Sequence, residues 1–319
     1  MSELAAGVDL GGTKIQTVVL RGMDVVGSDR IETPQSGVDD VVAAIVTTID
    51  GSLAQADAER GELAGVGIGS PGEIDAETGV VAESPNVPGF QKKVPLGPRV
   101  ADALGTGVRV RLSNDVRVAM LGEHRRGAGR PYRDVLGVFV GTGVGGGLIL
   151  DGALREGRGA AGEIGHTTVK PEGRMCSDGR RGHLEAYAGR GRMEVHARNL
   201  VEHGKDTILF DIARDRGKDR LSSGVFAKAL KHGDEMAMSL VDGAVWALGI
   251  ALASAQNLLD LEAIVIGGGL GDRLGRPFVD RIAEAMAPRL FVPGHAPAML
   301  TTELGDLGGA VGAALLAAG

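Results

Sequence analysis

The chain of 319 residues contains one cysteine, Cys176. A single thiol excludes a disulfide bond within the chain, which agrees with a reducing compartment. Long apolar runs are also lacking, because none reaches the roughly 18 residues that a membrane span needs. The first residues, MSELAAGVDLGG, lack the basic region and the apolar stretch of a signal peptide. We therefore expect a cytoplasmic protein without a membrane segment.

Basic residues are not in excess, with 34 Lys and Arg against 41 Asp and Glu and a formal net charge of −7. Because no basic face is expected, the composition predicts that nucleic acid is not a partner. The length is large for one hydrophobic core and suits two domains of ordinary size.

Glycine is abundant, with 53 residues against a usual share of about 7%. The segment VFVGTGVGGGLILDG, residues 138–152, contains the pattern G-x-G-x-x-G at Gly141, Gly143 and Gly146. A dinucleotide-binding turn requires a helix after the glycines, whereas here the strand-like GLILDG follows. No stretch has the G-x-x-x-x-G-K-[ST] order of a Walker P-loop. The segment therefore predicts a glycine hairpin.

This strand, glycine turn, strand pattern occurs twice, since AAGVDL, GGTK and IQTVVLRG at residues 5–22 resemble residues 135–152. Asn114 and Asp115 follow the strand 107–112 and can cap the helix after them. The spacing of apolar residues predicts helices over 37–56, 116–127, 234–259, 276–290 and 308–318, and further strands over 63–72, 262–270 and 298–304. The sequence thus predicts an α/β protein with an internal repeat.

The glycine hairpins are suited to phosphate, because backbone N–H groups without a neighbouring Cβ can approach phosphate oxygens. The first hairpin adds a carboxylate for Mg²⁺ and a hydroxyl and an ammonium for phosphate. We expect one polyphosphate to be bound by Asp9, Gly11, Gly12, Thr13 and Lys14 together with Gly141, Thr142 and Gly143 and a third cluster at Gly267, Gly268 and Gly269.

An ordered set of motifs resembles the ROK family (repressor, open reading frame, kinase) over nearly the whole chain, and within it the glucokinases. The motifs are GVDLGGTK, GIGSPG, SPNVPG, NDVRVAMLGE, GTGVGGGLILDG, GEIGH, NLLDLEAIVIGGG and LGDLGGAVGAALL. The resemblance implies an actin/hexokinase-like (ribonuclease H-like) fold of two α/β lobes with ATP and sugar in the cleft between them. The smaller lobe would comprise residues 1–115, completed by the C-terminal helix 303–319. Residues 116–302 would form the larger lobe, with a zinc-type loop and a dimerisation surface.

The activity that the resemblance implies is ATP-dependent phosphorylation of glucose to glucose 6-phosphate with Mg²⁺. Such a reaction needs a carboxylate that takes the proton of the sugar 6-hydroxyl, and the motif assigns this role to Asp115. By resemblance, the sugar hydroxyls would be bound by Asn86, Asn114, Asp115, Glu163, His166 and Glu185. The family also implies a homodimer.

The chain departs from the family at its zinc motif, in which one histidine is followed by C-x-C-G-x-x-G-C-x-E. Here the segment reads CSDGRRGHLE, so that Asp178 and His183 replace the second and third cysteines. Zinc accepts thiolate, imidazole and carboxylate, and His166, Cys176, Asp178 and His183 are therefore a reasonable tetrahedral set. A loop held by hydrogen bonds without metal is the alternative.

Three other functions stay open at this point. The first is a kinase for another hexose, such as mannose, fructose or an N-acetylated amino sugar. The second is a glucokinase that uses polyphosphate as the phosphate donor. The third is a sugar-responsive repressor of the same family, which carries a DNA-binding segment before the first hairpin. Only eight residues precede Asp9, and we therefore expect no such segment.

Overall fold

The computed structural model describes residues 3–84 and 87–318, which form two compact units. Unit 1 comprises residues 1–131, 147–161 and 303–319, and unit 2 comprises residues 132–146 and 162–302. The helix that begins at Asp115 thus belongs to unit 1. The first lobe was predicted to end at residue 115, whereas unit 1 continues beyond it. The reason is packing, because this helix lies against the C-terminal helix of the same unit.

Unit 1 contains a five-stranded sheet in the order β3-β2-β1-β4-β7. Its strands are β1 (Leu4–Leu10), β2 (Lys14–Arg21), β3 (Asp24–Glu32), β4 (Leu63–Ser70) and β7 (Val110–Asn114). The first three strands pair antiparallel, which confirms the predicted hairpin, while β4 is parallel to both β1 and β7. A separate hairpin is formed by β5 (Glu73–Asp75) and β6 (Val80–Glu83).

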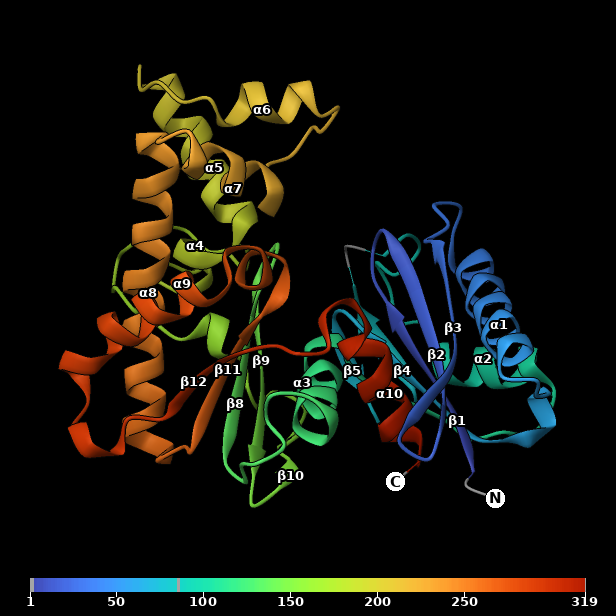
Figure 1. The fold of residues 1–319 in the computed structure, drawn as a ribbon. Helices are drawn as coiled ribbons and strands as arrows, with labels where there is room; N and C mark the ends of the chain where they lie inside the picture. The colour runs from blue at the N-terminus through green and yellow to red at the C-terminus, as the bar shows by residue number, and fades with distance from the viewer. Residues whose placement is uncertain (1–2, 85–86, 319) are drawn as a thin grey trace. The chain divides into compact units, whose positions relative to one another are not determined.

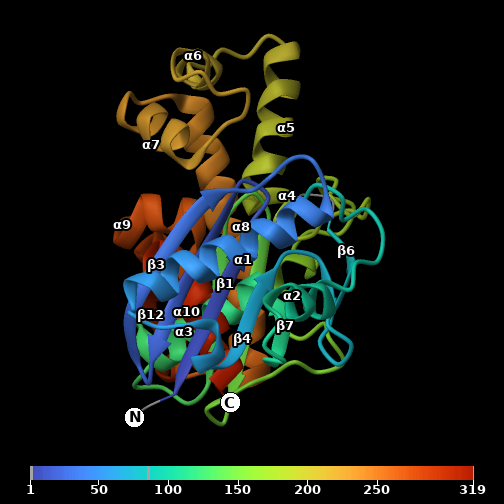
Figure 2. The ribbon, with the colours of Figure 1, turned by 90° about the vertical axis from the view of Figure 1, so that its right-hand side faces the viewer.

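Helices cover both faces of this sheet (Figures 1 and 2). One face carries α1 (Val38–Gln55), with α2 (Leu96–Leu104) beside it, over the main apolar core of the unit. The other face carries α10 (Gly308–Ala318), which packs on α3 (Asp115–Arg126). The contact with α10 is close, since a Cβ on Gly67 of β4 would lie 1.8 Å from the carbonyl oxygen of Ala313.

The second sheet has the order β10-β9-β8-β11-β12 and contains the predicted repeat of the hairpin. Its strands are β8 (Val135–Val140), β9 (Val144–Leu150), β10 (Ala153–Leu154), β11 (Ala263–Gly267) and β12 (Ala298–Thr301). The division between the units falls within β9, after Gly146. Strand β11 is parallel to both β8 and β12.

The α-helices of unit 2 are α4 (Glu185–Ala188), α5 (Arg190–Glu202), α6 (Leu209–Asp215), α7 (Ser223–Lys231), α8 (Glu235–Leu259) and α9 (Gly268–Met286). Short 3₁₀ helices occur at Arg60–Glu62, Ile164–His166, Ala287–Arg289, Pro293–His295 and Gly305–Leu307. In the part of the chain that the structure describes, α8 is the one helix with the length and hydropathy of a membrane span. Its apolar stretch is 67% buried within the protein, as in a core helix.

The helix predicted near 276–290 is present as the second part of α9 (Gly268–Met286), after a bend at Gly275. The strand predicted over 262–270 is too long, because β11 ends at Gly267 and a first part of α9 that was not predicted begins at Gly268. The fully buried Leu270 packs the first turns into the core, and this burial outweighs the low helix propensity of the glycines. The Gly267–Gly269 cluster therefore lies at the beginning of a helix.

Candidate active site

Asn114 and Asp115 lie where β7 ends and α3 begins. Asn114 is the N-cap residue, and its Oδ1 accepts a hydrogen bond from the Val116 N–H at 3.0 Å, as predicted. Asp115 is the first helical residue, and its Oδ1 accepts from the same N–H at 2.9 Å. Because β4 and β7 are parallel, their carboxyl ends meet at the edge of the sheet where ligands of open α/β sheets bind.

Asp9 stands at the corresponding end of β1 and belongs to a group of charged residues. The pKa of this carboxyl is raised to about 7, mainly by burial and in addition by the carboxylates of Asp115 and Asp306, while Lys14 opposes the shift. A Cβ on Gly309 in α10 would lie 2.8 Å from the Asp9 carboxyl carbon, so the glycine allows this approach. Lys14 Nζ is 3.3 Å from Asp306 Oδ2.

Each of the two glycine turns is closed by one backbone hydrogen bond. The Gly11 N–H donates to the Lys14 carbonyl, and the Gly141 N–H donates to the Gly143 carbonyl, both at 2.9 Å. The second turn is held by Glu185, whose Oε2 accepts from the Val144 N–H at 2.9 Å. Thr142 Oγ1 accepts from Arg190 Nη2 at 3.3 Å, a contact that no motif predicts.

The third glycine cluster lies at the N-terminus of α9. Gly268 has φ +79°, and a Cβ there would lie 2.7 Å from the Val140 backbone nitrogen, which requires glycine. Gly267 provides no side-chain cap for the first turn. The first N–H groups of the helix have no partners within the helix, and such groups bind anions.

The four predicted zinc ligands come together in unit 2. One donor atom from each of His166, Cys176, Asp178 and His183 lies within 4.8 Å of the others. Asp178 Oδ2 is 3.4 Å from His166 Nδ1 and 3.2 Å from His183 Nδ1. Such separations fit a tetrahedral ion with bonds of about 2.0–2.3 Å to nitrogen, oxygen and sulfur. Burial raises the pKa of the Cys176 thiol, whose proton a bound metal would displace.

The predicted sugar ligands are only partly brought together. Glu185 and His166 flank Cys176, with Glu185 Oε1 at 3.7 Å and His166 Nδ1 at 4.0 Å from its Sγ. Glu163 precedes the 3₁₀ helix that ends at His166. Asn86 lies outside the described residues. Ser177, which donates to Glu185, was not predicted, since no motif marks it.

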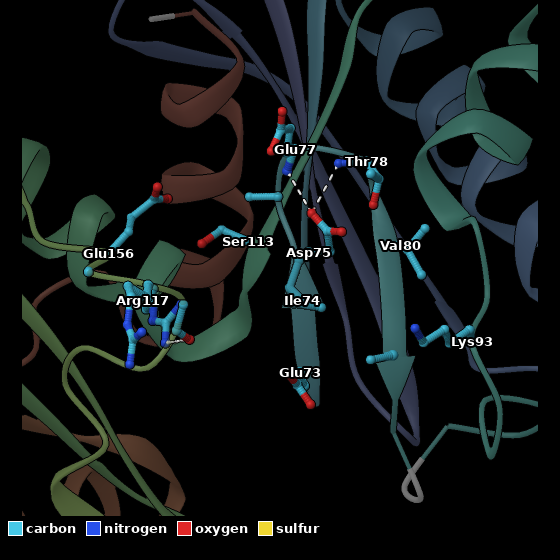
Figure 3. A pocket seen from close by; sticks show the side chains of 15 residues that line it. Glu73, Ile74, Asp75, Glu77, Thr78, Val80, Lys93, Ser113, Arg117 and Glu156 are labelled. Carbon is cyan, nitrogen blue, oxygen red and sulfur yellow. Dashed lines mark hydrogen bonds between the residues drawn. The ribbon is translucent and has the colours of Figure 1, made fainter.

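A groove of about 980 Å³ opens in unit 1 beside the Asn114–Asp115 junction. Figure 3 shows Arg117 and Glu156 on one side, Asp75, Val80 and Lys93 on the other, and Ser113 between them. Arg117 is 5% exposed and donates to the Gly159 carbonyl, which fixes the loop 156–159 at the rim. The lining is polar and contains both signs of charge.

Comparison with known proteins identifies this architecture. The chain is similar to the crystal structures of a ROK hexokinase from Thermus thermophilus (TM-score 0.83, 31% identity, covering 99% and 98% of the two chains) and of a Streptomyces griseus ROK glucokinase in complex with glucose and AMPPNP (0.79, 31%, 99% and 99%). The two units therefore have the actin/hexokinase-like fold.

The ROK family model matches residues 5–319, and the chain belongs to the ROK family. It is 34% identical over 288 residues to a glucokinase of Thermotoga maritima, covering 88% of each chain. It is also 32% identical over 327 residues to an N-acetyl-D-glucosamine kinase of Pectobacterium atrosepticum, covering 97% of each.

Proposed function

We propose that the chain is an ATP-dependent hexose kinase that converts glucose to glucose 6-phosphate. The observation that carries this proposal is the position of Asp115. Its carboxylate interacts electrostatically with that of Asp9, and it lies on the first turn of a helix that Asn114 caps. A carboxylate fixed in this way suits a general base. Membership of the ROK family and 34% identity to a glucokinase support the choice of reaction and of acceptor.

In the proposed reaction, Asp115 takes the proton of the sugar 6-hydroxyl. The hydroxyl oxygen forms a bond to the γ-phosphorus, and the bond between this phosphorus and the β,γ-bridging oxygen breaks to release ADP. The N–H groups of the two glycine turns, Lys14 and the start of α9 would bind the phosphates. Burial raises the pKa of Asp9 most, and the charges of Asp115 and Asp306 add to the shift, so a cation such as Mg²⁺ would be favoured at this group. When bound, Mg²⁺ neutralises phosphate charge.

The test is the variant Asp115→Asn, assayed by ADP release with a panel of hexoses. We expect kcat to fall at least about a hundredfold, because the base is lost, while the melting temperature and the affinity for ADP are kept. The control is Asp102→Asn, an exposed position on α2. If the Asp115 variant retains more than a few per cent of the rate, Asp115 is not the base.

An N-acetylated amino sugar is a second candidate for the acceptor. The relative that phosphorylates N-acetyl-D-glucosamine adds support. The ratio of kcat/KM for glucose and N-acetyl-D-glucosamine decides between the two acceptors.

We also propose that Zn²⁺ binds His166, Cys176, Asp178 and His183. The compact group of one sulfur, one oxygen and two nitrogen donors supports this proposal. The ion would cross-link the loop between His166 and His183 and so hold Glu185, which contacts both Cys176 and Ser177. Its role would be structural, since all four positions are filled by protein.

A further inference from the structure

Arg190 lies between two of the glycine clusters in unit 2. Its backbone N–H donates to the Gly141 carbonyl at 3.1 Å, and its Nη2 donates to Thr142 Oγ1 at 3.3 Å. On the other side, a Cβ on Gly269 would lie 4.0 Å from the same Nη2. The guanidinium therefore stands beside both the second glycine turn and the first turn of α9.

The charge of Glu194 acts on this guanidinium without a close ion pair between the two. Among residues 3–84 and 87–318, no carboxylate oxygen lies within 4.0 Å of Arg190, and its buried Nε has no hydrogen-bond partner. The nearby Glu194 is engaged elsewhere: it pairs with Arg198 at 2.7 Å and with Arg220 at 4.0 Å. Burial and the charge of Arg220 lower the pKa of Arg190. A half-buried cation bound only by neutral oxygens is costly unless an anion completes its environment.

The surrounding groups favour an anion at this place. The N-terminus of α9 offers N–H groups without a side-chain cap, and Ser223 Oγ lies 3.6 Å from a Cβ built on Gly269. Arg220 adds a second positive charge, with its Nη2 at 3.5 Å from a Cβ built on Gly191, the residue after Arg190. Two neighbouring guanidinium groups repel each other, and a ligand with several negative charges offsets this repulsion.

We infer that Arg190 binds a phosphate group of the nucleotide donor through its Nη2, with Arg220 as an auxiliary cation at the same anion. The inference rests on the proposed kinase function and adds to it a donor-binding residue outside the glycine motifs. A guanidinium suits this role, because it stays charged and its N–H groups form charge-assisted hydrogen bonds to phosphate oxygens.

The experiment compares binding of ADP and of adenosine by calorimetry for the full chain and the variants Arg190→Met and Arg190→Lys. For Arg190→Met we expect the Kd of ADP to rise at least about tenfold, as for a lost charge-assisted hydrogen bond. The Kd of adenosine is expected to stay within about twofold, because adenosine has no phosphate. For Arg190→Lys we expect a Kd of ADP between those of the unmodified chain and Arg190→Met, since lysine keeps the charge but lacks the planar guanidinium. Arg214→Met, at a position 74% exposed on α6, is the matched control.

The outcomes separate the inference from the function on which it rests. An unchanged Kd of ADP in Arg190→Met overturns the inference, as does an equal rise for ADP and adenosine, which would mean that Arg190 only holds Thr142. If Arg190→Met does not fold, Arg190→Lys decides by the same comparison. If the unmodified chain binds neither ADP nor ATP, the proposed kinase function itself fails, and the inference fails with it.

Discussion

The carboxylate of Glu185 occupies the space over Gly143, because a Cβ at position 143 would lie 2.3 Å from Glu185 Oε2. The same oxygen accepts from the Val144 N–H, and the other accepts from Ser177. With both oxygens bound and the residue 8% exposed, the side chain has little freedom to move aside. The glycine turn and a predicted sugar ligand are thus mechanically linked within unit 2.

Gly143→Ala should therefore destabilise the protein and displace Glu185. We expect a loss of about 1–3 kcal/mol in the free energy of unfolding, as for overpacking at a tight site, and a higher KM for the sugar. Gly141→Ala provides the stability control, because the nearest atom to its Cβ would be 3.9 Å away. Denaturant unfolding of both variants gives the comparison, and equal losses would contradict the steric explanation.

The raised pKa of Asp9, about 7 in the folded chain against 3.8 for the ordinary group, predicts a pH dependence of stability. Between these values the folded state keeps a proton that the unfolded state has lost, so stability falls as the pH rises from about 4 to 7. Asp9→Asn removes this dependence. We expect the variant to be more stable than the unmodified chain at pH 8, by a few kcal/mol, and to differ little at pH 4.

The measurement is denaturant unfolding at both pH values with EDTA present and without nucleotide, so that bound cations do not offset the charge. Asp39→Asn, an exposed residue of α1, is the control for loss of a negative charge. A difference between Asp9→Asn and the unmodified chain that is the same at pH 4 and pH 8 would show that Asp9 titrates normally.

Local patterns predicted the parts of the fold that depend on neighbours in sequence. The two hairpins follow from short glycine turns between runs of β-branched residues, and the cap at Asn114 follows from one polar side chain before an amphipathic segment. Both signals lie within a few residues of the structure that they specify. The close approach of the zinc-type ligands is also fixed mainly by a short loop, residues 166–183.

The features of the fold that local sequence patterns did not predict depend on contacts between residues far apart in the chain. The start of α9 depends on the burial of Leu270, and the assignment of α3 to unit 1 depends on its contact with α10. No element was predicted over residues 186–233, where α5 buries only Met193, Glu194 and Ala197 and its apolar pattern is weak. Arg190 lies in this stretch, and its position beside Thr142 follows from a contact between residues 48 apart.

The contact between β4 and α10 predicts a strong effect of Gly67→Ala. The added Cβ would lie 1.8 Å from the Ala313 carbonyl oxygen, and a backbone atom cannot move without shifting the helix. We expect a loss of at least about 2 kcal/mol in the free energy of unfolding. Gly61→Ala is the matched control, since its Cβ would meet no atom within 4 Å. If Gly67→Ala and Gly61→Ala unfold at similar urea concentrations, the close packing of α10 on the sheet is refuted.

The compact donor group at His166, Cys176, Asp178 and His183 predicts one zinc ion per chain in protein purified without chelator. Because structural zinc contributes directly to folding, a strong chelator should lower the melting temperature of the unmodified chain. Cys176→Ala should contain little zinc and melt at the same temperature with and without chelator. Asp206→Asn, an exposed carboxylate outside the group, should keep both the zinc and the response. Less than about one-tenth equivalent of zinc in fully active protein would show that hydrogen bonds alone hold this loop.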